Sequence, residues 1–144
     1  MENIRKDEIL GIIPFLGIIT RILHGKSGLP CGAGDNSFAI TTDGKVLSCP
    51  VAHDIQWNHL GDLHSFKRIS NKIDPCISCE VFDICGGRCL FAQKERLWGI
   101  DGFKAICDVT KFLIKELNKH IDELRFLRDV IYYPPFNNTT EIIP

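Results

Sequence analysis

The sequence has no apolar run long enough to cross a membrane. Its longest one, residues 9–23, falls short of the roughly 20 residues that a spanning helix needs, and Pro14, Gly17 and Arg21 interrupt it. It is also a poor signal peptide, because acidic residues precede it and no small-residue cleavage site follows. We therefore expect a cytoplasmic protein that does not enter a membrane.

The chain also has little net charge, −1 from 17 basic and 18 acidic residues. Its Lys and Arg residues are scattered along the sequence, so we expect no binding to nucleic acid. It has no glycine loop with a phosphate-binding lysine, and no Ser–His–Asp grouping. Nucleotide hydrolysis and serine-type acyl transfer are therefore not expected.

Cysteine, in contrast, is abundant. The seven cysteines are Cys31, Cys49, Cys76, Cys79, Cys85, Cys89 and Cys107. An odd number argues against a closed set of disulfides. In a reducing compartment, clustered thiols are more often metal ligands than bridges. We therefore interpret the cysteines as thiolate ligands.

Four of the cysteines form the compact run Cys76-x2-Cys79-x5-Cys85-x3-Cys89. The two residues between the first pair let the backbone fold around one site, and thiolates bind either tetrahedral zinc or an iron–sulfur cluster. The spacing alone does not choose between these two. Gly86 and Gly87 let the backbone approach a bulky cofactor, which favours a cluster over a single ion. The same pair is also typical of a tight turn with no ligand nearby.

The remaining pattern predicts a small α+β domain with a β-hairpin between flanking helices. Asp43-Gly44 separates two β-prone runs, residues 38–41 and 46–48, and this dipeptide is a strong hairpin signal. Apolar periodicity predicts helices at residues 5–23 with a break at Pro14, 63–73, 88–97 and 103–131. Between the second and third of these, we expect a cysteine-rich loop over residues 76–89.

The first expected helix, residues 5–23, has apolar side chains on almost every face. Such a helix must be buried on several sides, and a small domain has little to bury it with. We infer that it packs on a partner domain. The alternative is a core helix of this domain, since periodicity alone does not separate the two.

The whole cysteine pattern, with its surroundings, resembles the SPASM domain that follows the catalytic barrel of radical S-adenosylmethionine enzymes. The matching segments are Cys31-Gly-Ala-Gly34, Asp43-Gly44, Cys49-Pro50, Leu60-Gly-Asp-Leu63, Cys85-Gly-Gly-Arg-Cys89 and Cys107. The resemblance covers about residues 30–110. It implies a helical segment at 1–25 that belongs to or packs on a barrel domain, a SPASM domain at 26–110, and a C-terminal helix and tail at 111–144.

The resemblance also implies two auxiliary [4Fe–4S] clusters. The first would take Cys31, Cys49 and Cys89, and the second would take Cys76, Cys79, Cys85 and Cys107. Some relatives have an eighth cysteine shortly after the first one, but residues 32–37 here contain none. One iron of the first cluster would then be open to a substrate, or Asp35 or His53 would fill it. Without a cluster, Asp35 is a loop residue and His53 a surface residue. Arg88 would donate hydrogen bonds to cluster sulfides, or form a surface ion pair.

The chain lacks the CxxxCxxC loop with which radical enzymes bind and cleave S-adenosylmethionine, because Ala92 stands where the third cysteine would follow Cys85 and Cys89. The chain is therefore not catalytic alone, and S-adenosylmethionine belongs to the full enzyme. We expect an auxiliary role, electron relay or peptide anchoring, with a radical S-adenosylmethionine barrel and a peptide substrate as partners. Fragment, split subunit and stand-alone descendant remain open. The alternatives are a zinc-binding interaction module and a ferredoxin-like electron carrier.

Overall fold

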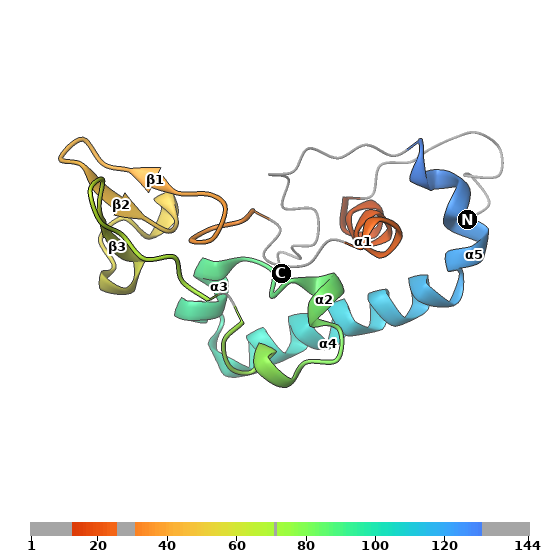
Figure 1. Cartoon of the computed structure of the whole chain (residues 1–144). Coiled ribbons are helices and arrows are strands. Elements are labelled where there is room, and N and C mark those ends of the chain that lie inside the picture. Colours follow the sequence, from red (N-terminus) through yellow and green to blue (C-terminus); the bar gives the residue numbers. More distant parts are fainter. Residues whose placement is uncertain (1–12, 26–30, 71, 131–144) are drawn as a thin grey trace.

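The computed structural model describes residues 13–25, 31–70 and 72–130. These residues form a small α+β fold, which confirms the fold class expected from the sequence. A three-stranded antiparallel sheet lies at one end, and most of the helices lie at the other (Figure 1). Among the described residues, no helix combines the length and the apolar character that crossing a membrane requires.

The helices and strands are mostly short. The helices are α1 (Ile13–His24), α2 (Phe82–Cys85), α3 (Leu90–Glu95), α4 (Gly99–Lys119) and α5 (Ile121–Leu124). The 3-10 turns are η2 (Pro50–Ala52), η3 (Gln56–Asn58), η4 (Cys76–Ser78) and η5 (Arg125–Arg128). The strands are β1 (Ala39–Ile40), β2 (Lys45–Leu47) and β3 (His59–Asp62). The short helix expected within residues 88–97 is thus confirmed as α3.

Helix α1 buries its apolar side chains in the core of the chain itself. Ile18 is fully buried and packs with Val81 and Ile114, next to the cysteine-rich segment. Ile19 packs with Leu124 of α5, so two adjacent faces of α1 are covered. The described part of the expected 5–23 helix is therefore a core helix of this domain. Residues 5–12 lie outside the described residues.

The predicted uninterrupted helix over residues 103–131 is wrong. Helix α4 begins earlier, at Gly99, and the chain turns at His120 before α5 and η5. The His120 N–H donates to the Leu117 carbonyl at 3.1 Å, which closes a tighter turn than an α-helix has. The turn brings Leu124 and Leu127 against α1, where both are fully buried. Burial of these two leucines therefore accounts for the break.

The hairpin is confirmed, with Ala39 opposite Leu47 and Ile40 opposite Val46. Gly44 has φ of 82° in its turn, a conformation that glycine adopts without strain. The third strand, β3, pairs antiparallel with β2 and was not expected. It extends the two-stranded hairpin to a three-stranded sheet.

The predicted helix over residues 63–73 is also wrong. Phe66 instead forms an isolated bridge with Gly61, and its ring lies 5.1 Å from the ring of Phe38. The Ile69 N–H donates to the Gly34 carbonyl at 3.0 Å. The apolar residues of this segment therefore have separate partners beside the sheet, instead of sharing one face of a helix.

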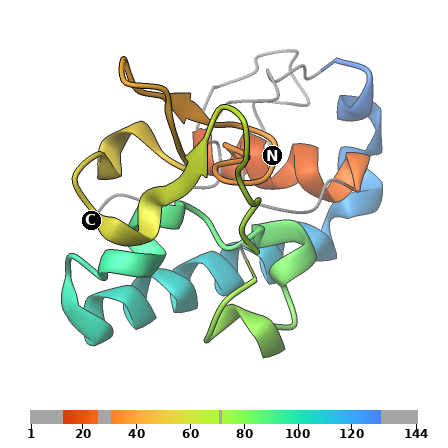
Figure 2. The ribbon, with the colours of Figure 1, turned by 60° about the vertical axis from the view of Figure 1, so that its left-hand side comes forward.

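The segment 76–89, expected to be a loop, contains η4 and α2. Helix α2 packs against both α1 and α4, and Figure 2 shows the green segment running beside α4. The part of this segment that ends at Cys85 is therefore held between two longer helices.

Candidate functional site

Four cysteines line one cavity. Cys76 begins η4, Cys79 follows it, Cys85 ends α2, and Cys107 lies in α4. The cavity has a volume of about 20 Å³, which is room for roughly one water molecule. The resemblance assigns these same four residues to the second cluster, and the packing of α4 along the 76–89 segment adds Cys107 to the other three.

A larger pocket lies beside the cavity. It has a volume of about 430 Å³ and shares Cys76, Cys79 and Cys107 with the cavity as lining residues. Its other lining residues include Lys104 and Asp108, whose charged groups are 2.9 Å apart. Three of the four thiols therefore border more open space than the small cavity itself provides.

Burial changes the acidity of two of these thiols. Burial raises the pKa of Cys76 to about 11, and the neighbouring thiols Cys85, Cys107 and Cys79 add to this, while Arg88 acts in the opposite direction. Burial also raises the pKa of Cys85. Both thiols hold their protons at neutral pH when no cation is bound. A metal would have to displace these protons, because the thiolate is the ligand form.

Arg88 is a buried charge within this site. Its side chain is only 1% exposed, so the surface ion pair considered from the sequence is wrong. Its Nη2 donates to Cys107 Sγ at 3.7 Å, and its guanidinium lies 5.1 Å from the centre of the Phe103 ring. Arg88 also has φ of 61°, which is unfavourable for a residue with a side chain. The structure thus holds a guanidinium against the Cys107 thiol at some conformational cost.

Gly86 and Gly87 form the turn that sets this arginine in place. Both are buried, with φ of 69° and 84°. A Cβ on Gly87 would lie 2.6 Å from Nε2 of Gln93, and that nitrogen donates to the Gly87 carbonyl. The space next to Gly87 is therefore taken by Gln93. Both glycines supply the positive φ that this turn needs. This agrees with the interpretation of the pair as a tight turn.

Arg21 of α1 is a second buried arginine that sequence reasoning missed as a site residue. Burial lowers the pKa of Arg21, and the charge of Cys85 acts in the opposite direction. The signal was present in the sequence, because Arg21 is the only charged residue within residues 9–23. A lone arginine in an apolar helix needs a buried partner.

The other three cysteines lie towards the sheet. Cys31 and Cys49 both pack against the buried pair Ala33 and Leu90. Cys89 directly precedes Leu90, at the start of α3. Cys31 and Cys49 thus lie in one region that the cavity of the other four cysteines does not include, and Cys89 adjoins this region through Leu90.

The two residues considered for the open iron have polar surface partners. Asp35 lies 3.8 Å from Arg68, and His53 contacts Asp54 at 2.7 Å. The side chain of His53 is exposed, as expected for a surface residue. These contacts agree with the interpretation of Asp35 as a loop residue and of His53 as a surface residue.

The thiols do not converge on one point. Within residues 13–25, 31–70 and 72–130, no group of three or more His, Cys, Asp or Glu side chains is arranged to hold a metal ion. None of the seven cysteines is in a disulfide. The donor set nevertheless fits a thiolate-bound cofactor in kind, since four cysteines and a buried arginine surround one cavity. A comparison of the chain with protein-family models, curated proteins and solved structures finds no match.

Proposed function

We propose that this chain is a SPASM-like auxiliary domain that binds two [4Fe–4S] clusters. The first would be held by Cys31, Cys49 and Cys89, and the second by Cys76, Cys79, Cys85 and Cys107. Such clusters, when bound, supply one-electron transfer at a potential that the protein tunes. We further propose that the domain serves a cytoplasmic radical S-adenosylmethionine enzyme that modifies peptides, as an electron relay or as an anchor for the peptide.

The observation that carries this proposal is the cavity lined by four cysteines. Three of them come from a short stretch of chain, but Cys107 comes from a separate helix. Arg88 is almost fully enclosed beside these thiols and donates to Cys107. A guanidinium at this place favours the thiolate form in which cysteine binds a cluster.

The residues around the cavity have separate tasks in this proposal. Gln93 links two cysteine-bearing segments, because it donates to the Gly87 carbonyl and its Oε1 lies 3.8 Å from Cys76 Sγ. Phe103 covers Arg88. Together they hold the loop between Cys85 and Cys89 in place.

Anaerobic reconstitution with iron and sulfide tests the proposal, followed by metal counting and Mössbauer spectroscopy. We expect about eight irons per chain and a brown absorption band. A colourless protein with about two zinc ions would replace the proposal with the zinc-binding module. Disulfide-linked protein without metal would reject both.

The auxiliary role needs a second measurement. The iron-loaded chain is mixed with any CxxxCxxC-containing barrel protein that is encoded next to it, and binding is followed by size-exclusion chromatography. A stable complex supports the auxiliary role. Reversible one-electron reduction without binding would instead indicate a free electron carrier.

A further inference from the structure

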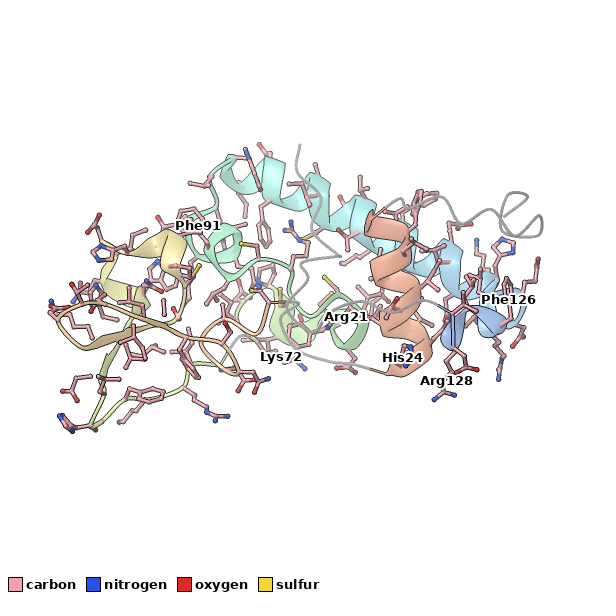
Figure 3. The ribbon with its side chains drawn as sticks, turned by 90° about the horizontal axis from the view of Figure 1, so that it is seen from above. Arg21, His24, Lys72, Phe91, Phe126 and Arg128 are labelled. Carbon is pink, nitrogen blue, oxygen red and sulfur yellow. The ribbon has the colours of Figure 1, made fainter. Side chains whose placement is uncertain are left out.

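Arg88 shares the small cavity with the four cysteines of the second set. It comes from the turn between Cys85 and Cys89, and its side chain lines the cavity with only 1% of its surface exposed. Its Nη2 donates to Cys107 Sγ at 3.7 Å. A second buried arginine, Arg21, lies on the side of α1 that faces α2 and donates to a backbone carbonyl of α2 (Figure 3). The contact of Arg88, in contrast, reaches a thiol of the cavity directly.

The Arg88 guanidinium is held from two segments of the chain. Its own backbone belongs to the turn, where its N–H donates to the Cys85 carbonyl at 3.5 Å. The ring of Phe103, on α4, lies 5.1 Å from the guanidinium and lines the same cavity. Phe103 and Cys107 are four residues apart on this helix, so they share one face of it. The ring that covers Arg88 and the thiol that accepts from it are therefore fixed relative to each other.

A hydrogen bond to a ligand sulfur affects the two redox states of a cluster unequally. The potential of an iron–sulfur cluster depends in part on such bonds. Reduction adds one electron, so the ligand sulfurs become more negative, and a hydrogen bond from a cationic donor becomes stronger. The bond from Arg88 to Cys107 would thus stabilise the reduced form relative to the oxidised form. The effect comes from the donated bond itself, whatever other contacts the guanidinium makes.

We propose that Arg88 is a positioning residue that orients Cys107 and raises the reduction potential of the second cluster through the hydrogen bond that it donates. This inference rests on the proposed function. The residues of the first set, Cys31, Cys49 and Cys89, are not among those that line the cavity. The first cluster should therefore respond less to a change at Arg88.

The test is an anaerobic redox titration of the iron-loaded chain, followed by electron paramagnetic resonance with mediator dyes. Two backgrounds assign the potentials, because Cys31→Ser should keep the second cluster and Cys107→Ser should keep the first. In the Cys31→Ser background, Arg88→Met should make the midpoint potential more negative. The expected size is about tenfold in the reduction equilibrium, which is about 59 mV for a one-electron couple. In the Cys107→Ser background, the same substitution should leave the midpoint nearly unchanged.

Two further variants separate the donated bond from charge and packing. Arg88→Lys keeps a cationic donor and should restore most of the shift. Arg96 is a matched control, because it also has a positive φ, 48°, and its guanidinium lies 5.7 Å from the centre of the Phe103 ring. It is not among the residues that line the cavity. Arg96→Met therefore removes the same charge and a similar ring contact, and it should leave both midpoints nearly unchanged.

The outcomes distinguish this inference from the proposed function. An unsubstituted chain that binds no iron–sulfur cluster overturns the proposed function first. An iron-loaded Arg88→Met chain with an unchanged second midpoint, or with no larger shift than Arg96→Met, overturns only the role of Arg88. If Arg88→Met does not assemble, Arg88→Gln replaces it. We then expect a shift of about threefold, since a neutral hydrogen bond is roughly half as strong as a charge-assisted one. No shift in that variant overturns the inference equally.

Discussion

Asn58 binds both backbone groups of Cys49. Its Oδ1 accepts from the Cys49 N–H at 2.7 Å, and its Nδ2 donates to the Cys49 carbonyl at 2.7 Å. The same side chain also accepts from the Ser48 hydroxyl and donates to the Ala52 carbonyl. An asparagine side chain has two donors and two acceptor positions, and all of them are used at a fully buried site.

Replacing Asn58 should therefore damage both stability and the first cysteine set. In Asn58→Ala, the peptide groups of Cys49 lose their partners in the interior, and we expect a loss of about 3 kcal/mol in the free energy of unfolding. Urea unfolding measures it. The iron content should fall as well, because the backbone that presents Cys49 is no longer fixed.

Asn118→Ala is the matched control, since Asn118 is exposed on α4. We expect it to change stability by less than about 0.5 kcal/mol and to leave the iron content unchanged. An Asn58→Ala chain that is as stable as the control would show that the Asn58 contacts contribute little.

Iron loss in single and double cysteine variants tests which thiols share a cluster. Cys107→Ser removes a ligand from the cavity, and Cys31→Ser removes one from the region near the sheet. Each variant should lose about half of about eight irons. Adding Cys76→Ser to Cys107→Ser should cost little more, because both residues line one cavity. Combining Cys107→Ser with Cys31→Ser should remove nearly all the iron.

This pattern follows from the non-additivity of changes at one site. Metal analysis after anaerobic reconstitution provides the measurement. Equal iron loss for both double variants would contradict the division of the seven cysteines into two sets.

The sequence predicts those parts of the fold that local chemistry determines. Asp-Gly between β-prone residues is a strong turn signal, and the hairpin turn lies at Asp43-Gly44 as expected. Strand β3 has no such signal. Its residues, His59–Asp62, include a glycine and an aspartate, which are depleted in strands. They form a strand because β2 has a free edge, and this depends on residues far along the chain.

The end of helix α4 and the burial of Arg88 and Arg21 were not predicted either, because they too depend on residues far apart in the sequence. Apolar periodicity continues past His120, so no local signal ends the helix, and only the burial of Leu124 against α1 explains the turn. The cysteine spacing indicated which thiols could gather. It did not indicate that Arg88 would be buried beside them, or Arg21 between α1 and α2, because burial is a property of the assembled helices.

Gly87 should tolerate no side chain. In Gly87→Ala, the residue keeps a φ near 84° that is strained for alanine, and its Cβ meets Nε2 of Gln93. We expect a destabilisation of about 1–3 kcal/mol and a lower iron content, because the turn sets the positions of Cys85 and Cys89. Thermal or urea unfolding of the iron-loaded chain provides the comparison.

Gly99→Ala separates the effect of backbone strain from the effect of a steric clash. Gly99 has φ of 70°, but an added Cβ there would meet nothing within 4 Å. We expect it to cost about 1 kcal/mol from strain alone, with no change in iron content. Equal effects of the two substitutions would mean that the contact between Gly87 and Gln93 is unimportant.

Removing iron and sulfide should largely unfold the chain. Cys31 and Cys49 of the first cysteine set pack against a cluster with two buried apolar residues, Ala33 and Leu90, and its other members are partly exposed. A small domain with so little core depends on its bound metal for stability. Around the second set, Cys76 and Cys85 would keep their protons, because burial raises the pKa of both thiols.

Circular dichroism and two-dimensional NMR of the chelator-treated chain, kept reduced, provide the measurement. We expect a loss of most helical signal and a collapse of amide dispersion, and reconstitution should restore both. Helices α1, α4 and α5 share a purely apolar contact around Ile19 and Leu124, so any residual structure should be confined to them. A cooperative and well-dispersed fold of the metal-free chain would show that the cysteines do not depend on a cofactor for their arrangement, and it would remove the main support for a cluster-binding domain.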